Sequence, residues 1–264
     1  MESIVKAAVM GLVEGVTEFL PISSTGHLIL AGDILRFGGP LAATFEIFIQ
    51  LGAVLAVVWF YREDLSRQLR TLASDTGVRR LWFNVVVAFV PAAVVGVLLH
   101  RWIKAVLFSP VVVAVSLFAG GIALLLVERR RHAEQVHELR AVSTRQALVV
   151  GLAQTLSLVP GVSRSAASIV GGLLSGLDRT TATAFSFYLS IPTLGLATLF
   201  ELATSLSGLG AGDLLLLGVG LVVAFASAFV AVGWLLRYVA THDLRPFGWY
   251  RILIGLLVLL WFER

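Results

Sequence analysis

The sequence predicts an all-α polytopic membrane protein with an inverted-topology repeat, six transmembrane helices and two re-entrant helical hairpins. Three observations lead to this prediction: an apolar composition, the length of the apolar stretches, and a self-similarity between the two halves of the chain. Of the 264 residues, 58% are hydrophobic and 14% are charged, and the mean hydropathy is +0.93. A water-soluble domain of this size would have too little polar surface, so we expect an integral membrane protein.

Six apolar stretches predict the transmembrane helices. Several of them approach or exceed the roughly 20 residues that a helix needs to cross a hydrocarbon core of about 30 Å. The strands of a membrane barrel would instead alternate in polarity over about 10 residues. The predicted spans cover residues 42–61, 81–99, 109–127, 182–200, 212–236 and 249–262.

The positions of the arginines predict which loops face the cytoplasm. The segments 62–80 and 128–146 carry five arginines each, and Arg237 and Arg245 flank the last long loop. Because basic residues accumulate on cytoplasmic loops, we expect these three loops inside and the segment 100–109 outside. This topology accounts for the net charge of +4 without nucleic acid, and it makes membrane lipid head groups the expected anionic partners.

Two further segments, 3–37 and 147–178, predict re-entrant hairpins. Each contains an apolar piece of helix length, then a break rich in proline, serine and glycine, then a second short apolar piece. A broken backbone at membrane depth is tolerated only where it is buried in protein or lines a wet cavity. Two ordinary crossings in each segment are the alternative interpretation.

The two halves of the chain resemble each other at an offset of 140 residues. GLVEGVTEFLPISST (11–25) aligns with GLAQTLSLVPGVSRS (151–165), and FEIFIQLG (45–52) aligns with FSFYLSIP (185–192). Each half has three spans, an odd number, so the second copy must enter the membrane from the opposite face. We therefore expect a single membrane domain, 1–264, with a first repeat at 1–127, a cytoplasmic linker at 128–146 and a second repeat at 147–264.

Acidic residues in apolar surroundings are the first candidates for a functional site. Glu14 and Glu18 lie four residues apart on one helical face, where like charges repel. A charge at membrane depth costs on the order of 3 kcal/mol or more. The pair is tolerable if one carboxyl is protonated, if a divalent cation bridges them, if a basic side chain faces them, or if they merely solvate a wet interface. Glu46 would support such a site or serve in polar packing, and Gln154 aligns with Glu14.

The stretch PISSTGHL adds groups for nucleophilic chemistry. It supplies the hydroxyls of Ser23, Ser24 and Thr25, together with His27, whose side chain titrates near neutrality. A hydroxyl close to a histidine and a carboxylate has the parts of an activated nucleophile. Serine and threonine also commonly cap helices and form contacts between membrane helices, so this stretch alone does not indicate a catalytic site.

The stretch PGVSRSAAS indicates an anion site. Arg164 lies between Ser163 and Ser165, where a helix is expected to begin, and this combination suits a phosphate. Its alternative role is counter-ion to Glu14 or Glu18. Acid–base groups with an anion clamp favour phosphoryl chemistry on a lipid, whereas inverted repeats with broken helices are also typical of a transporter or flippase for an anionic lipid phosphate. Both classes remain open at this stage.

Together, EGVTEFLPISSTGH and PGVSRSAAS resemble the motifs of the bacterial undecaprenyl-diphosphate phosphatase family, also known as bacitracin-resistance proteins. The similarity extends over nearly the whole chain and includes TFEIFIQLGAVLAVV and GLAQTLSLVPG. It implies a multi-pass enzyme of the bacterial inner membrane that removes the terminal phosphate of undecaprenyl diphosphate. The product is the lipid carrier for peptidoglycan and other envelope polymers. The resemblance also implies that bacitracin competes for this lipid.

The resemblance assigns roles to residues by motif. It implies a carboxylate pair at Glu14 and Glu18, a proposed nucleophile at Ser24, the histidine at His27 and the diphosphate-binding arginine at Arg164. The family's divalent cation, Mg²⁺ or Ca²⁺, would bind the carboxylate pair. The further residues expected to contact substrate are Ser23, Thr25, Ser163, Ser165, Gln154 and Glu46.

The chain departs from the family pattern at Ala166 and Ser168, where glycine and threonine are expected, and we expect only a modest backbone adjustment there. The site is expected to open to the outer, periplasmic face, because the family's substrate is released on that side. The glycine-rich runs GGIALLLVE and GVGLVVAFASAF would allow close helix approach, either between two copies in a homodimer or within one chain.

Overall fold

The structure, a computed structural model, describes residues 2–38, 40–130, 136–205 and 211–262. In this part of the chain the regular secondary structure is helical, which confirms the predicted all-α class. The α-helices are α1 (Glu2–Thr17), α2 (Ser24–Leu35), α3 (Pro40–Phe60), α4 (Arg62–Thr71), α5 (Thr76–Val106), α6 (Pro110–Arg129), α7 (Thr144–Thr155), α8 (Arg164–Leu174), α9 (Arg179–Ser205), α10 (Ala211–Val239) and α11 (Arg245–Phe262), and the 3-10 helices are η1 (Leu139–Ala141) and η2 (Leu156–Leu158).

Within the described ranges, five helices are long and apolar enough to cross a membrane: α5, α6, α9, α10 and α11. Each of them overlaps one predicted span. The remaining predicted span, 42–61, corresponds to α3, which passes the same test only together with α4, across a bend of 68°. The protein is therefore a multi-pass membrane protein with five or six candidate spans.

The prediction of a loop over 62–80 was wrong in part, because this segment contains α4. Leu65 packs on the main hydrophobic core, and the buried Gln68 donates its amide N–H to the hydroxyl of Tyr188 at 2.9 Å. The arginines of REDLSRQLRT lie elsewhere on the helix surface. Because the segment is highly charged, its sequence did not indicate the amphipathic helix, whose core-facing side is short.

The most extensive helix contacts join the two halves of the chain to each other. They pair α6 with α11, α5 with α7, and both α1 and α3 with α10. Two of these contacts depend on glycine: Gly11 of α1 lies against the carbonyl oxygen of Gly220, and Gly151 of α7 lies against that of Ala88. Gly11 and Gly151 are 140 residues apart, so the close packing occurs at corresponding positions of the two halves.

We expect Gly11→Ala to lower the thermal unfolding midpoint in detergent. The added Cβ would overlap backbone atoms of Gly220, and overpacking of this kind typically costs about 1–3 kcal/mol. Gly218→Ala on the same facing helix is the matched control, because nothing lies within 4 Å of a Cβ added there. An unchanged midpoint for Gly11→Ala would contradict the close approach of α1 and α10.

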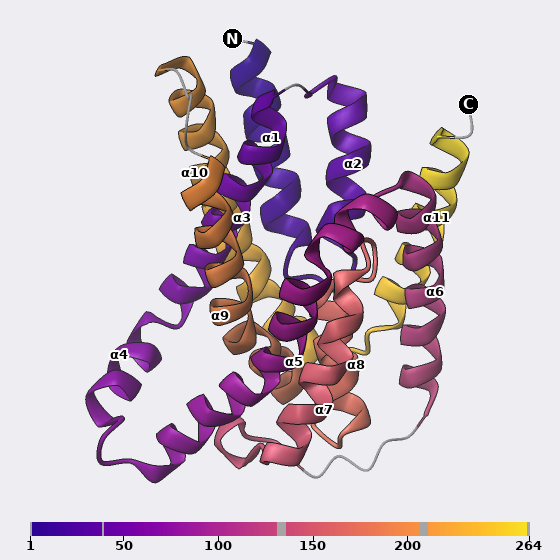
Figure 1. Ribbon diagram of the computed structural model, residues 1–264. Helices are drawn as coiled ribbons and strands as arrows, with labels where there is room; N and C mark the ends of the chain where they lie inside the picture. The colour runs from indigo at the N-terminus through magenta and orange to yellow at the C-terminus, as the bar shows by residue number, and fades with distance from the viewer. Residues whose placement is uncertain (1, 39, 131–135, 206–210, 263–264) are drawn as a thin grey trace.

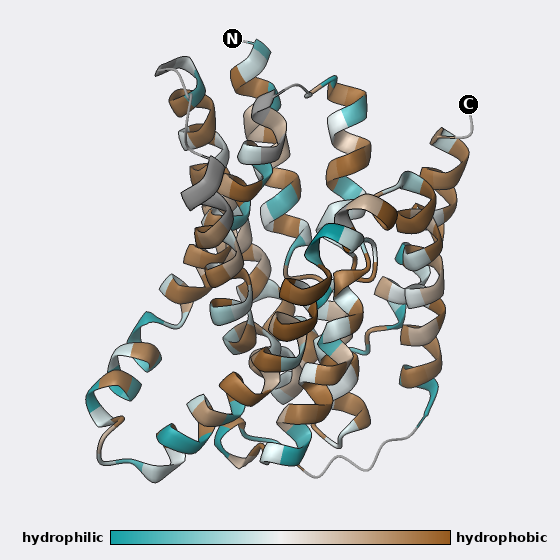
Figure 2. Cartoon of the chain, viewed as in Figure 1, coloured by the Kyte–Doolittle hydropathy of each residue, from teal (hydrophilic) through white to brown (hydrophobic). Residues whose placement is uncertain are grey.

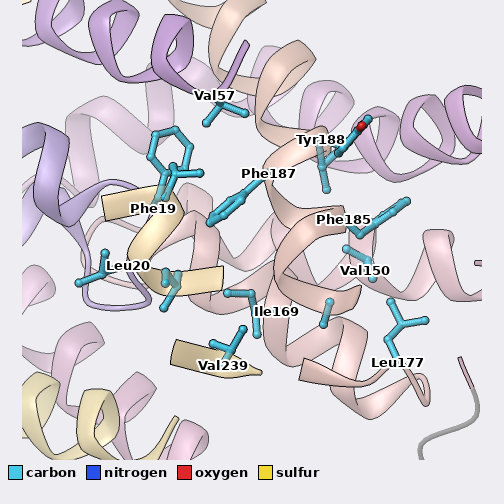
Figure 3. Close-up of a cluster of buried hydrophobic side chains, with 14 of the residues drawn as sticks. Phe19, Leu20, Val57, Val150, Ile169, Leu177, Phe185, Phe187, Tyr188 and Val239 are labelled. Carbon is cyan, nitrogen blue, oxygen red and sulfur yellow. The ribbon is translucent and has the colours of Figure 1, made fainter. Parts of the chain in front are cut away.

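The hydrophobic core lies between the halves, and the outer surface is apolar as well. Figure 3 shows buried side chains from both halves converging, including Phe19 and Phe187, whose rings meet edge to face at 5.4 Å. In Figure 2 the long helices are hydrophobic along much of their length, whereas α4 carries hydrophilic stretches. Large side chains such as Val97 and Leu98 are 80% and 75% exposed, which suits contact with lipid tails.

The segments that carry the loop arginines gather at one end of the molecule. In Figure 1, α4 and the start of α7 lie at the lower end, whereas the start of α1 and the end of α11 lie at the upper end. This arrangement agrees with the predicted common side for 62–80 and 128–146. Arg131, one of the five arginines that predicted a cytoplasmic position for 128–146, lies outside the described residues.

Candidate active site

Two interruptions of the helices form the framework of the candidate site. The first separates α1 from α2 and contains Pro21, and the second separates α7 and η2 from α8 and contains Pro160. Proline cannot donate the backbone hydrogen bond that would continue a helix. Ser23 and Ser163, which directly precede α2 and α8, both have a φ of 72°, a rare conformation for residues other than glycine. The correspondence at an offset of 140 residues thus includes this unusual backbone turn.

The two interruptions touch each other inside the protein. The hydroxyl of Ser165 donates to the carbonyl oxygen of Leu20 at 2.7 Å. The guanidinium of Arg251, on α11, donates to the carbonyl oxygens of Pro21 at 3.2 Å and Val162 at 2.9 Å. Polar side chains from distant parts of the chain are therefore brought to one buried region.

A buried ion pair lies at the centre of this region. Arg164 Nη2 lies 3.3 Å from Glu18 Oε1, and the two side chains are 7% and 6% exposed. The second carboxylate oxygen of Glu18 accepts the hydroxyl hydrogen of Ser24 at 2.6 Å. Of the two candidate counter-ions for Arg164, the structure selects Glu18, and the same carboxylate holds the candidate nucleophile.

The guanidinium of Arg164 is held in place on several sides. Its Nη1 donates to the carbonyl oxygen and the hydroxyl of Ser186, at 3.1 and 3.2 Å, and its Cζ lies 5.3 Å from the ring centroid of Phe19. Ser168 contacts the Ser186 hydroxyl at 2.7 Å, so this departure from the family pattern supports the same network. Arg164 Nε is buried without a hydrogen-bond partner among the described residues, which leaves a donor for an anionic ligand.

The carboxylate pair fits a divalent cation in part. Glu14 is 1% exposed, and its buried Oε2 lacks a hydrogen-bond partner in the described chain. Within the described residues, no group of three or more His, Cys, Asp or Glu side chains could hold a metal ion. Mg²⁺ commonly binds through one or two carboxylates and completes its shell with water and substrate phosphates. Glu14 and Glu18 are suited to that mode of binding.

Among the described residues, His27 forms no hydrogen bond with Ser24 but contacts two other groups. Its Nδ1 lies 2.7 Å from the carbonyl oxygen of Ser23, and its Nε2 lies 2.7 Å from the hydroxyl of Tyr250 on α11. The planes of the two rings are nearly parallel, at an angle of 4°, and their centroids lie 5.5 Å apart. The carboxylate of Glu18, rather than the imidazole, is therefore the titratable group that contacts Ser24.

The other residues predicted to bind substrate divide into two groups. Ser163 caps α8 by accepting the N–H of Ala166 at 3.2 Å and lies 3.1 Å from the Ser165 hydroxyl, so both serines belong to the region where the interruptions meet. The structure does not join the remaining four to the Arg164 network by any hydrogen bond within the described residues. These four are Ser23, whose carbonyl oxygen contacts His27, Thr25, Gln154, whose buried Oε1 has no partner there, and the exposed Glu46.

Sequence reasoning missed four residues of this site: Phe19, Ser186, Tyr250 and Arg251. Arg251 carried a signal, because an ionisable residue inside the predicted span 249–262 is a functional candidate by default. Ser186 occupies the position that aligns with Glu46, which was a second signal. No sequence pattern marked Phe19 or Tyr250, since their roles depend on contacts with distant residues.

In this multi-pass helical protein, an arginine, carboxylates and hydroxyls lie where two interrupted helices meet. Such a site is typical of a membrane protein that binds an anionic group. Residues 7–257 match a protein family described as Bacitracin resistance protein BacA, and the chain belongs to this family. The resemblance that the two motifs indicated is therefore confirmed.

Curated relatives resemble the chain over nearly its full length. It is 50% identical over 256 residues to the undecaprenyl-diphosphatase of Dechloromonas aromatica (strain RCB), covering 97% of this chain and 93% of the relative. It is 50% identical over 254 residues to that of Laribacter hongkongensis (strain HLHK9), covering 96% and 93%. It is 51% identical over 261 residues to undecaprenyl-diphosphatase 1 of Burkholderia ambifaria (strain ATCC BAA-244 / DSM 16087 / CCUG 44356 / LMG 19182 / AMMD), covering 97% and 95%.

Proposed function

We propose that this protein hydrolyses undecaprenyl diphosphate to undecaprenyl phosphate and inorganic phosphate, and so regenerates the lipid carrier for envelope polymers and confers bacitracin resistance. The relatives named undecaprenyl-diphosphatase support this activity. The structural observation that carries it is the buried network in which Arg164, Glu18 and Ser24 are joined by hydrogen bonds. This network combines an anion clamp, a base and a nucleophile.

The geometry supports attack by Ser24. Its oxygen would form a bond to the terminal phosphorus while its proton passes to Glu18, with which it already shares a hydrogen bond of 2.6 Å. The bond from that phosphorus to the bridging oxygen breaks, and undecaprenyl phosphate leaves. Water then hydrolyses the phosphoserine to release inorganic phosphate. Attack by a water that His27 activates remains the competing route.

Arg164 supplies the electrostatic part of the reaction. Its guanidinium is fixed by Ser186 and Phe19 before substrate arrives, so it needs little reorganisation to face developing negative charge. A divalent cation, Mg²⁺ or Ca²⁺, bound by Glu14 and Glu18 would neutralise phosphoryl oxygens. The orphaned Glu14 oxygen supports this assignment, and the side chains of Ser163 and Ser165 line the same region.

We expect Ser24→Ala to lower the hydrolysis rate by a factor of about 10² or more, because the activated nucleophile is lost. Rapid quenching of the wild-type protein with labelled polyprenyl diphosphate should yield a phosphoserine at position 24. Ser74→Ala, in the turn between α4 and α5, is the control for loss of a hydroxyl. Substantial turnover by Ser24→Ala would instead favour the route through water.

The architecture that we propose is an inverted repeat, 1–127 against 147–264, with six transmembrane helices and two re-entrant hairpins. The equal φ values at Ser23 and Ser163 support the repeat. Figure 1 adds support, since α1 descends from the upper end of the molecule whereas α7 starts at the lower end. With 62–80 and 128–146 in the cytoplasm, the protein would lie in the bacterial inner membrane and its site would open to the periplasmic face.

Reconstitution in liposomes tests the proposed function. A polyprenyl diphosphate serves as substrate, and released phosphate and head-group translocation are measured separately. We expect hydrolysis, and we expect added bacitracin to lower it by sequestering the substrate. Translocation without hydrolysis would overturn the phosphatase assignment and establish the alternative, a transporter or flippase of an anionic lipid phosphate, which the interrupted helices would also suit.

A further inference from the structure

The contacts of His27 define its tautomer. The carbonyl oxygen of Ser23 can only accept a hydrogen bond, so His27 Nδ1, at 2.7 Å, must carry a hydrogen. In the neutral imidazole, Nε2 then has a lone pair and accepts. The hydroxyl of Tyr250 at 2.7 Å is therefore the donor to Nε2.

We infer that Tyr250 is a positioning residue, which holds the neutral imidazole of His27 as the Nδ1–H tautomer and fixes the orientation of its ring. This inference rests on the proposed function for the catalytic role of His27, but the tautomer itself is independent of that role. The two ring planes are nearly parallel, with an angle of 4° between them, so the hydroxyl oxygen lies close to the plane of the imidazole, where the Nε2 lone pair points. His27 is thus held through both ring nitrogens.

The neighbouring residue Arg251 fixes the place of Tyr250. Arg251 is fully buried, and its guanidinium donates to carbonyl oxygens of Pro21, Gly161 and Val162. These bonds set the position of α11 against both helix interruptions. Tyr250, one residue earlier on the same helix, is thereby placed beside the imidazole without a flexible loop between them.

The arrangement keeps its hydrogen bond in both protonation states of His27. When Nε2 takes up a proton, it becomes a donor, and the oxygen of Tyr250 can accept through a lone pair. The ring can therefore stay in place in either protonation state. The single lone pair of neutral Nε2 is occupied by Tyr250, which agrees with Glu18, and not His27, being the group that contacts Ser24.

The kinetic test is a double-mutant cycle between Tyr250 and His27. Tyr250→Phe keeps the aromatic ring and removes the hydroxyl, so we expect kcat to fall about tenfold with KM unchanged. In a His27→Ala background the same substitution should cause no further loss. Two outcomes would overturn the inference and leave the phosphatase assignment intact. One is an equal loss of kcat in both backgrounds, and the other is a wild-type kcat for Tyr250→Phe together with an inactive His27→Ala protein.

The matched control is Tyr238→Phe. The ring of Tyr238 also stacks on a histidine, His242, with centroids 4.7 Å apart and an angle of 13°, but no hydrogen bond joins these two side chains in the described residues. We expect it to leave kcat unchanged. A fall in kcat as large as that of Tyr250→Phe would mean that the effect is not specific to the tyrosine beside His27, and it would overturn the inference.

A spectroscopic measurement tests the tautomer without reference to activity. In protein labelled with ¹⁵N-histidine, the His27 signals, assigned by their loss in His27→Ala, should show a protonated Nδ1 and an unprotonated, hydrogen-bonded Nε2 at a pH where the ring is neutral. Tyr250→Phe should shift the Nε2 signal, and Tyr238→Phe should leave it in place. A protonated Nε2 in the neutral ring would overturn the inference, even if hydrolysis proved normal.

Discussion

Arg164→Ala is expected to lower the rate of polyprenyl diphosphate hydrolysis by at least about 10²-fold, because removal of one preorganised charge-stabilising donor has an effect of that size. The guanidinium is buried, and its Nη1, Nη2 and aromatic face are already occupied by Ser186, Glu18 and Phe19. The free Nε then remains for a phosphoryl oxygen. Phosphate release from detergent-solubilised enzyme measures the effect.

Loss of activity in Arg164→Ala could also result from a destabilised protein, so the test needs a stability control. Removing one partner of a buried ion pair typically costs about 3–5 kcal/mol, since the other charge is left uncompensated. In the double variant Arg164→Ala/Glu18→Gln neither charge remains. We expect this variant to recover much of the unfolding midpoint but none of the activity, and recovery of hydrolysis in it would remove both residues from the site.

Arg164→Lys separates charge from geometry. Lysine keeps the positive charge but offers one compact ammonium group in place of a planar fork. It cannot donate to Ser186 and Glu18 with the same geometry and leave a further donor for substrate. We expect KM and kcat both to worsen relative to the wild type, and wild-type rates would show that the phosphate needs only a nearby charge.

Arg251→Ala should produce the largest loss of stability among the substitutions considered. The side chain is fully buried and donates to carbonyl oxygens of both helix interruptions, and each buried acceptor left unpaired costs about 1–3 kcal/mol. Among the described residues no carboxylate forms an ion pair with Arg251, so its function is to hold backbone. We expect a large fall in the thermal midpoint in detergent, with loss of hydrolysis.

Two further variants make the test of Arg251 specific. Arg237→Ala removes an exposed arginine near the end of α10 and should leave the midpoint nearly unchanged. Arg251→Lys can reach some of the carbonyl oxygens but not all of them, so it should give an intermediate midpoint. A near wild-type midpoint for Arg251→Ala would mean that packing alone keeps the two interruptions together.

The overall helical pattern was predictable because it depends on local sequence. Stretches of about 20 apolar residues must form hydrogen-bonded helices in a membrane, whatever the rest of the chain does. The breaks at Pro21 and Pro160 were visible for the same reason. The helix α4 was missed because its short inner face, with Leu65 and Gln68, makes sense only against the core that it covers.

The sequence by itself determined that Glu18, Ser24, His27 and Arg164 would be functional candidates, since polar groups in apolar surroundings are costly and are retained for a reason. The tertiary structure decided how they are connected. It paired Arg164 with Glu18, placed Ser24 on that carboxylate, and set Tyr250 against His27 across 223 residues of sequence. These contacts arise from the packing of whole helices, whose relative rotation and depth no local pattern specifies.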